Sequence, residues 1–437
     1  MLQAARREVR GMPSKPVSYE KALAKIYSLD RFGSRLGLER ISRILVLLGS
    51  PEKNYKCVLV AGSNGKGSTV EMLGCIFSSN GWKTGTYFSP QIEEFPERIR
   101  INSRNADKCE IAAAYSEVAA VCSKNSIPAT FFEVVTAMAL LVFSWRRVKF
   151  AVLEVGLGGR LDATNAVEPD ISAIASISLE HTEVLGGTVE QIAHEKCGIA
   201  RKGKPLVVGQ VGGATRKAIE RECIAMGAKP VFVSDDVRVG KLVKKGSCYA
   251  FSAAFNRANY SISLSTPGKF QVSNACSALA VASLLGAKRQ AIEKGLRSAA
   301  PKYRLQAISK HPLVIADCCH NPGAAFAIAA ELRGLFGKKI LLFSAMRDKD
   351  YGQVLDILRP FFSQLVLTEV SLERAASVGE MEKAAKRAGF MPIGVKNPAK
   401  ALAQAKRLAG ENGTLLIAGS VYLLAELFGK DKIQIAQ

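Results

Sequence analysis

Short apolar runs with strand character alternate with helical patterns from residue 58 onward, and this alternation is compatible with only a few folds. Such a pattern predicts βαβ units and a mainly parallel sheet covered by helices, which is an α/β fold. The first strand is expected at 56–61, followed by a glycine loop and a helix from about 68 to 80. A later strand ends at Glu154, and another is expected within 170–177.

The same alternation starts again after a break at Pro301. Before the break, short alternating runs between about 231 and 264 predict a small antiparallel sheet. Strands of the second series are expected at 313–317, 339–344, 365–370 and 414–419. Because 437 residues exceed what one compact core usually holds, we expect more than one domain. We place a basic extension at 1–17, a first domain at 18–299 and a smaller Rossmann-like domain at 300–437.

Composition excludes several classes of protein. No apolar run approaches the roughly 20 residues that a membrane span needs, and the basic start has no signal-peptide core. The ten cysteines contain no CxxC pair and fall mostly in apolar runs. This pattern indicates reduced, buried thiols in a cytoplasmic protein, without a zinc site or a disulfide framework.

The net charge of +22 is large, but its lysines and arginines are spread along the whole chain. A nucleic-acid-binding NTPase would explain this charge, although no aromatic-rich basic motif accompanies it. Attraction of polyanionic small molecules, or a general bias in composition, explains the charge equally well.

The strand that ends at Glu154 runs into a glycine-rich segment, with glycines at 156, 158 and 159. In an open α/β sheet, ligands bind outside the carboxyl ends of the strands, so Glu154 is placed where a ligand would lie. Glycines allow the backbone to approach that ligand closely. The alternative is a buried strand followed by an ordinary glycine turn.

A second glycine loop lies between the first predicted strand and its helix. Its residues are Gly62, Ser63, Asn64, Gly65, Lys66, Gly67, Ser68 and Thr69. Backbone N–H groups at such a helix start bind phosphate oxygens, a lysine neutralises them, and a hydroxyl can reach Mg²⁺. The spacing differs from the usual Walker pattern, so a tight turn without a ligand remains the alternative.

Two further residues belong to the same half of the chain. His181 follows the strand that ends near Ser178, at the same sheet edge as Glu154 and the glycine loop. A lone histidine is more often a structural hydrogen-bonding group than a metal ligand, but this position favours a ligand. Lys196 would ordinarily be a solvated helix lysine, and its surroundings in the sequence favour nothing else.

Several longer motifs occur in a fixed order along the chain. They are GSNGKGST at 62–69, FSPQIEEFPERIRIN at 88–102, TFFEVVTAMAL at 130–140, LEVGLGGRLDATN at 153–165, SLEHT at 178–182, IAHEKCGI at 192–199, DCCHNPGAA at 317–325 and SAMRDKD at 344–350. Together they resemble the folylpolyglutamate synthase/dihydrofolate synthase family of the Mur ligase superfamily. The resemblance implies a P-loop-type ATPase domain followed by a Rossmann-like ligase domain.

The resemblance also implies an activity. ATP would phosphorylate a carboxylate of dihydropteroate or a reduced folate, and the amine of L-glutamate would displace phosphate from the acyl phosphate. One or two Mg²⁺ ions would be held by Ser68, Ser89, Glu154 and His181, together with Lys196 if that lysine is carbamylated as in the superfamily. Lys66, Lys196 and His181 would be the catalytic residues.

Residues of the second half would complete the ATP site. The resemblance assigns this role to Asn274, Arg304, Asp317 and His320, so the site would lie between the two domains of a monomer. Neither a nucleic acid nor a membrane is implied as a partner.

The chain departs from the family pattern at several positions. A histidine of the pterin-contacting loop is replaced by Gln91, and the usual aspartate before His181 is Glu180. Cys318 and Cys319 replace smaller residues. The phosphate and metal motifs are retained, whereas the acceptor loop differs. A Mur-type peptidoglycan ligase, or a ligase for another cofactor, therefore stays open as the alternative function.

Overall fold

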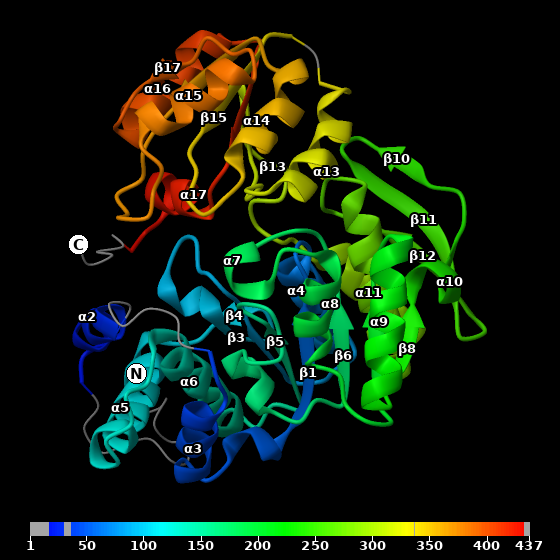
Figure 1. Ribbon diagram of the computed structural model, residues 1–437. Helices are drawn as coiled ribbons and strands as arrows, with labels where there is room; N and C mark the ends of the chain where they lie inside the picture. The colour runs from blue at the N-terminus through cyan, green and yellow to red at the C-terminus, as the bar shows by residue number, and fades with distance from the viewer. Residues whose placement is uncertain (1–16, 30–35, 336, 432–437) are drawn as a thin grey trace.

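The computed structural model describes residues 17–29, 36–335 and 337–431. The basic extension expected at 1–17 thus lies, apart from Val17, outside the described residues. Within them, the chain forms two large sheets covered by helices and one small antiparallel sheet (Figure 1). The predicted α/β fold with mainly parallel sheets is confirmed. No described helix is long and apolar enough to cross a membrane.

The first large sheet has the strand order β4-β3-β2-β5-β1-β6-β7-β8. Its strands are β1 (Lys56–Ala61), β2 (Thr84–Tyr87), β3 (Ile99–Ile101), β4 (Arg104–Asn105), β5 (Phe150–Glu154), β6 (Ile171–Ile174), β7 (Pro205–Val208) and β8 (Lys229–Phe232). Neighbours from β2 to β8 are parallel, and β3 and β4 extend the edge in antiparallel pairing. The central strands are continuous apolar runs because helices cover both of their faces.

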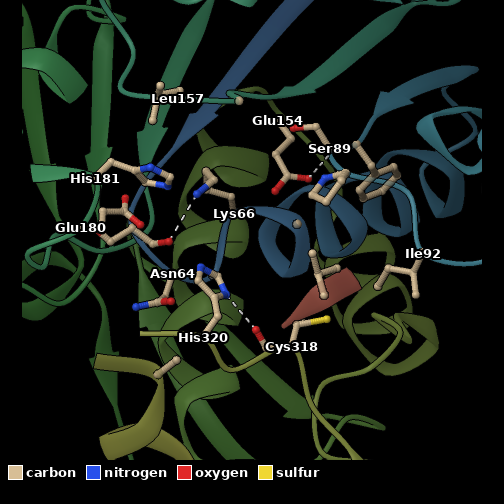
Figure 2. A pocket seen from close by; sticks show the side chains of 18 of the residues that line it. Asn64, Lys66, Ser89, Ile92, Glu154, Leu157, Glu180, His181, Cys318 and His320 are labelled. Atoms are coloured by element: carbon tan, nitrogen blue, oxygen red, sulfur yellow. Dashed lines mark hydrogen bonds between the residues drawn. The ribbon is translucent and has the colours of Figure 1, made fainter. Parts of the chain in front are cut away.

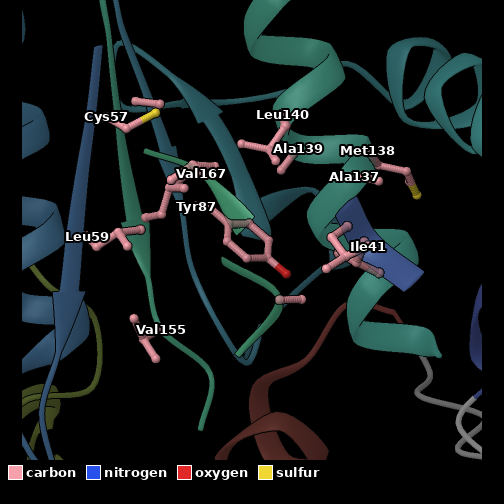
Figure 3. Close-up of a cluster of buried hydrophobic side chains, with 14 of the residues drawn as sticks. Ile41, Cys57, Leu59, Tyr87, Ala137, Met138, Ala139, Leu140, Val155 and Val167 are labelled. Atoms are coloured by element: carbon pink, nitrogen blue, oxygen red, sulfur yellow. The ribbon is translucent and has the colours of Figure 1, made fainter. Parts of the chain in front are cut away.

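Alternate side chains of β1 point to opposite faces of the sheet and belong to two different hydrophobic cores. Leu59 belongs to a core shared with α2, α3, α5, α6, α8 and α9, whereas Val58 and Val60 belong to one shared with α4, α11, α12 and the small sheet. In the first core, Tyr87 and Leu59 lie near residues of α6 (Figure 3). The helices are α2 (Tyr19–Ser28), α3 (Glu39–Leu47), α4 (Lys66–Ser79), α5 (Lys108–Lys124), α6 (Phe131–Trp145), α7 (Thr182–Leu185), α8 (Val189–Cys197), α9 (Gly213–Met226), α10 (Val233–Asp236), α11 (Phe270–Leu284) and α12 (Arg289–Ser298).

The small sheet consists of β9 (Arg238–Val239), β10 (Val243–Lys245), β11 (Cys248–Phe255) and β12 (Ala258–Ser263). All of its pairs are antiparallel, as the alternating pattern before residue 264 predicts. Its apolar face packs on the second core of the large sheet. Figure 1 shows β10 and β11 extending from this body towards α13 of the second half.

The second large sheet has the order β13-β14-β18-β15-β16-β17. Its strands are β13 (Gln306–Lys310), β14 (Leu313–Ala316), β15 (Lys339–Phe343), β16 (Gln364–Leu367), β17 (Ile393–Gly394) and β18 (Thr414–Ala418). Only β13 is antiparallel to its neighbour. The last strand in sequence, β18, lies between β14 and β15. The helices are α13 (Pro322–Leu332), α14 (Tyr351–Leu358), α15 (Val378–Arg387), α16 (Pro398–Ala409) and α17 (Val421–Phe428).

Two differences from the sequence prediction affect the site. The helix expected from about residue 68 begins at Lys66, because Gly65 adopts a left-handed conformation (φ 85°) and acts as its N-cap. The strand Thr84–Tyr87 was not predicted, since a four-residue run with threonine and glycine shows no apolar pattern. This strand lies beside β5 and leads directly to Ser89.

Candidate active site

The glycine loop between β1 and α4 has the shape of a phosphate-binding loop. A Cβ atom on Gly65 would lie 2.3 Å from Asn274 Oδ1, and one on Gly62 would lie 3.1 Å from the backbone N of Ser176. Both glycines have positive φ, so larger residues are excluded by conformation as well as by space. Lys66 Nζ donates hydrogen bonds to the carbonyl oxygens of Gly62 (2.7 Å) and Ser63 (3.3 Å). The lysine therefore folds over its own loop.

The loop is held in place by the segment after β6. Ser63 Oγ donates to the Ser178 carbonyl oxygen (3.0 Å) and accepts from the Ser178 N–H (2.9 Å). The Asn64 N–H donates to Ser176 Oγ at 2.9 Å. These bonds fix the loop before any ligand is bound, so phosphate binding would not have to order it.

Glu154 ends β5 beside the loop, since Glu154 pairs with Val60 of β1 in the sheet register. Its Oε2 atom accepts a hydrogen bond from the Ser89 N–H at 3.2 Å (Figure 2). Burial raises the pKa of Glu154, and Lys66 and the Ser89 N–H act in the opposite direction. A Cβ atom on Gly67 would lie 3.3 Å from Oε2, so the missing side chain lets the carboxylate reach the start of α4.

His181 lies on the other side of Lys66, after β6 (Figure 2). Lys349, from the loop after β15, lies 2.9 Å from His181 Nε2 and 3.2 Å from Asp348. Burial and the charge of Lys349 lower the pKa of His181 to about 4. The imidazole is therefore neutral at pH 7, and the lone pair of its Nε2 accepts a hydrogen bond from Lys349.

Lys196 forms a buried ion pair. Its Nζ lies 2.8 Å from Glu180 Oε1, and the two side chains are 2% and 6% exposed. Burial opposes ionisation of Glu180, but Lys66 and Lys196 lower the pKa of Glu180 to about 2. Lys196 lines a small cavity with Gly62, Lys66 and His181, next to the main cleft.

Residues of α11 and of the second large sheet form the opposite wall. Asn274 Nδ2 donates to Gln271 Oε1 at 2.9 Å, and Gln271 Nε2 lies 3.4 Å from Ser68 Oγ. At the end of β14, Asp317 accepts hydrogen bonds from the backbone N–H groups of Leu305 and Cys319, both at 2.8 Å.

Arg304 and His320 complete this wall. Burial opposes the charge of Arg304, but Cys318, Asp317 and Glu154 raise the pKa of its guanidinium. His320 Nδ1 donates to the Cys318 carbonyl oxygen (2.9 Å; Figure 2), and burial lowers the pKa of His320 to about 4.

Most of these groups face one cleft of about 1510 Å³ between the two large sheets. The predicted residues that line it are Ser63, Asn64, Gly65, Lys66, Gly67, Ser68, Ser89, Glu154, His181, Asn274, Arg304, Asp317 and His320. Gly62 and Lys196 line the adjoining small cavity, and Thr69 is buried beneath the loop.

The far end of the cleft contains Gln91, which is buried between two other side chains. Gln91 Nε2 donates to Tyr27 Oη at 2.9 Å, and Arg98 Nε donates to Gln91 Oε1. The Arg98 guanidinium also lies over the Phe131 ring, 5.1 Å from its centroid. This end of the cleft therefore combines aromatic rings with hydrogen-bonding side chains, which suits a flat ligand that forms hydrogen bonds.

The sequence prediction missed one residue that lines the cleft, Lys349, and two buried residues next to it, Gln271 and Asn321. Gln271 connects Asn274 to Ser68, and Lys349 lies against His181. Asn321 and Asn64 exchange two amide hydrogen bonds, at 3.0 and 3.2 Å, from opposite walls. Lys349 and Asn321 lie within two of the family motifs, at 344–350 and 317–325. No local pattern in the sequence indicates which distant residue each of them contacts.

The donor set fits a magnesium ion that is only partly coordinated by protein. Among the described residues, no three His, Cys, Asp or Glu side chains converge in a metal-binding group. Mg²⁺ is usually held by one or two carboxylates together with phosphate oxygens and water. The buried Glu154 carboxylate, which lies against Gly67 at the start of α4, provides that kind of partial site.

Models of two protein families match this chain. The Mur ligase middle domain matches residues 60–282, and the Mur ligase, glutamate ligase domain matches residues 303–421. A dihydrofolate synthase/folylpolyglutamate synthase of Escherichia coli (strain K12) is 31% identical over 404 residues, covering 90% of each chain. A probable bifunctional folylpolyglutamate synthase/dihydropteroate synthase of Haloferax volcanii is 33% identical over 421 residues, which are 94% of this chain and 50% of that protein. The chain thus spans about half the length of this archaeal relative.

Solved structures agree with these relatives. Mycobacterium tuberculosis folylpolyglutamate synthase complexed with ADP and AMPPCP superposes with a TM-score of 0.88 at 30% identity, covering 95% of this chain and 100% of that one. E. coli FolC in complex with DHPP and ADP gives 0.85 at 29% identity, covering 95% and 97%. The Mur-ligase-like fold is therefore confirmed, and the chain belongs to the folylpolyglutamate synthase/dihydrofolate synthase family of Mur ligases.

Proposed function

We propose that this chain is an ATP-dependent ligase that joins L-glutamate to the carboxylate of dihydropteroate, of a reduced folate, or of both. The observation that carries the proposal is the single cleft in which a phosphate loop, a buried carboxylate and three polar residues of the second sheet face one another. Family membership points to the same activity. FolC was solved with DHPP and ADP, and another structural neighbour with Mn, AMPPNP and L-glutamate bound.

The proposed reaction has two steps. An oxygen of the pterin carboxylate attacks the γ-phosphorus of ATP, ADP leaves, and an acyl phosphate forms. The amine of glutamate then attacks the acyl carbon, and phosphate leaves as the amide forms. We assign ATP binding to the loop 62–69 and to Asn274, Arg304, Asp317 and His320.

Charge neutralisation is the main task of the protein in this reaction, because phosphoryl transfer is catalysed largely by positioning and electrostatics. Lys66 lies at the loop where the β- and γ-phosphates would bind, and its ammonium would leave the carbonyls of Gly62 and Ser63 for phosphate oxygens. Arg304 would add a second positive charge from the opposite wall. When bound, Mg²⁺ would offset further phosphate charge, and we assign it to Ser68, Ser89, Glu154 and His181.

The proposal includes carbamylation of Lys196 in the loaded enzyme. Burial lowers the pKa of Lys196, which favours the neutral amine that reacts with CO₂. A carbamate would add a negative charge beside Glu180, so it requires a nearby cation to be stable. We propose that the Lys196–Glu180 ion pair is the state without metal and that the carbamate accompanies metal binding.

We further propose that 18–299 and 300–437 are separate domains and that the enzyme works as a monomer, since both walls of the cleft come from one chain. The ten cysteines are all free thiols, which supports a cytoplasmic location.

The test is a panel of acceptors. Purified protein with ATP, Mg²⁺ and L-glutamate is given dihydropteroate, tetrahydrofolate or a UDP-muramyl peptide, and glutamate-dependent phosphate release is measured. We expect release with at least one pterin and none with the muramyl peptide. Release with the muramyl peptide alone would assign the chain to peptidoglycan synthesis, and no release with either pterin would refute the proposal.

A further inference from the structure

The helix α11 lacks a capping side chain of its own. Its N-cap residue is Lys269, whose side chain makes no capping hydrogen bond. The first N–H groups of a helix need acceptors, and a carboxylate there also interacts favourably with the helix dipole. The Lys269 N–H donates instead to Glu331 Oε1 at 2.8 Å. Glu331 belongs to α13, so the cap comes from the other half of the molecule.

Glu331 is held firmly at this position. Its Oε1 also accepts from Tyr249 Oη (2.8 Å), and its Oε2 lies 2.9 Å from Lys244 Nζ. Its side chain is only 11% exposed. Burial opposes ionisation, but the hydrogen bonds from Lys244, Lys269 and Tyr249 lower the pKa of Glu331. The carboxylate thus ties α13 to β10, to β11 and to the start of α11, where Figure 1 shows these elements together.

The two helices tied by Glu331 are walls of the cleft. On α13, Ala324, Ala327 and Ile328 line the cleft. Residues three and four apart share one helix face, so Glu331 continues the face that these three residues form. Glu331 therefore fixes this face of α13 at the end of the helix that lies away from the phosphate loop.

On α11, the first turns carry the groups that reach the phosphate loop. Phe270, Ser273 and Asn274 line the cleft. Gln271 lies 3.4 Å from Ser68 and accepts a hydrogen bond from Asn274. A displacement of the start of α11 would therefore move side chains that contact the loop itself.

We propose that Glu331 is a positioning residue for the nucleotide, because it caps α11 across the junction and holds α11 and α13 at a fixed spacing beside the phosphate loop. This inference rests on the proposed function, in which a nucleoside triphosphate occupies that loop. The small antiparallel sheet takes part in this positioning, because its residues Lys244 and Tyr249 hold the Glu331 carboxylate in place.

The test measures AMPPNP binding by calorimetry in the full-length protein, without any pterin. Loss of the cap and of the linked wall spacing both disfavour the arrangement that binds the nucleotide, so Glu331→Ala is expected to weaken AMPPNP binding about five- to thirtyfold. Glu331→Gln keeps an oxygen acceptor for the Lys269 N–H and should stay within about threefold of wild type. Lys244→Met removes the ion pair but leaves the hydrogen bonds of Glu331 with Tyr249 and the Lys269 N–H, so it should weaken AMPPNP binding less than Glu331→Ala.

A second variant removes the same hydrogen bond from the other side. Lys269 has φ −59°, which matches proline, and proline at a helix start lacks only an N–H. Lys269→Pro should therefore weaken AMPPNP binding as Glu331→Ala does, and the double variant should be no weaker than the single ones. If Glu331→Ala does not fold, Lys269→Pro decides the question alone.

Kinetics distinguish positioning from general damage. We expect KM for ATP to rise, while kcat at saturating ATP and KM for glutamate change little, and loss of the cap lowers the thermal midpoint. Unchanged AMPPNP affinity in both variants would overturn the inference, and so would changes in kcat and in KM for glutamate as large as the change in KM for ATP. Failure of the proposed function looks different: wild type would bind AMPPNP, with the variant differences intact, but would glutamylate no pterin.

Discussion

At the scale of single residues, the cleft keeps its charges paired with local groups. Lys66 donates to two carbonyl oxygens of its own loop, Glu154 accepts from the Ser89 N–H, and Lys196 pairs with Glu180. A buried charge without such partners would be costly, so these contacts stabilise the site until phosphate or metal replaces them.

Lys66→Ala should remove the positive charge closest to the transferred phosphoryl group. We expect glutamate-dependent phosphate release to fall by at least about a hundredfold, since such electrostatic groups contribute about 10²–10³ in kcat. The fold should survive, because Lys66 is half-buried and bonds only to its own loop. Thermal unfolding checks the fold, and Lys217→Ala on the exposed side of α9 is the matched control. A near-normal kcat would contradict the assigned role.

Lys196→Ala distinguishes a carbamate from an ammonium group. If the functional group is a carbamate, added acetate or formate should restore part of the lost kcat, whereas methylamine should not. Rescue by methylamine instead would identify the ammonium of the Lys196–Glu180 pair as the active form. Wild-type activity without any supplement would remove Lys196 from the mechanism.

His320 should make stability depend on pH. Its pKa is about 4 in the folded protein, below its ordinary value of 6.5, so the unfolded chain binds more protons between these values. The free energy of unfolding should therefore fall as pH is lowered from about 6.5 to about 4. Urea unfolding across this window checks the sign. The variant His320→Gln should show a smaller slope than wild type, and an identical slope would contradict the assignment.

At the scale of elements, the residues before each helix determine where the cleft walls begin. Thr188 and Gln191 form the capping box predicted for α8, which carries Lys196. Asn321 caps α13 by accepting from the Ala324 N–H at 2.8 Å. The same amide exchanges hydrogen bonds with Asn64 of the phosphate loop, so it acts both within its helix and across the cleft.

Variants of the two asparagines should separate these roles. Asn321→Ala removes the cap and the contact with Asn64, and should lower the stability of the second half by about 1–2 kcal/mol. Asn321→Asp keeps the cap acceptor and should be nearly as stable as wild type. Asn64→Ala removes only the contact across the cleft and should cost less than Asn321→Ala. Equal shifts of the urea midpoint for both alanine variants would show that the cap contributes nothing.

Elements with strong local signals were predicted well. The strand 56–61 matches β1, and the antiparallel region predicted at about 231–264 matches β9 to β12 from residue 238, whereas 231–236 belong to the end of β8 and to α10. The strands 84–87 and 99–101 were not identified, because short runs with glycine, threonine and arginine acquire strand structure only by pairing with β5 and with each other. Site residues such as Glu154 and His181 could be predicted because each lies at or after the end of a strand, and the carboxyl ends of parallel strands meet at one edge of the sheet. Contacts such as Glu331 with Lys269 could not be predicted, because no local pattern records a partner so distant in sequence.

At the scale of the whole molecule, the charge of +22 should act on anionic substrates. A positive protein attracts ATP and carboxylates over several ångströms, and salt screens this attraction. We expect kcat/KM for the acceptor to fall several-fold between about 50 and 300 mM KCl, with kcat changed less. RNA should not stimulate ATP hydrolysis. Stimulation that declines steeply with salt would instead indicate a nucleic-acid-dependent NTPase.

The position of β18 has a consequence for the order in which the molecule is made. β18 follows β14, β15, β16 and β17 in the sequence, yet it pairs with both β14 and β15 in the middle of the second sheet. Domains fold as they emerge, so the first sheet can form while the second still lacks its centre. Until β18 is available, β14 and β15 have no common neighbour, and the Asp317 N–H lacks its acceptor, the Ile417 carbonyl oxygen at 3.0 Å. The second wall of the cleft therefore depends on a strand that is translated after every residue of the phosphate loop, so we expect the cleft to form only once β18 has been made.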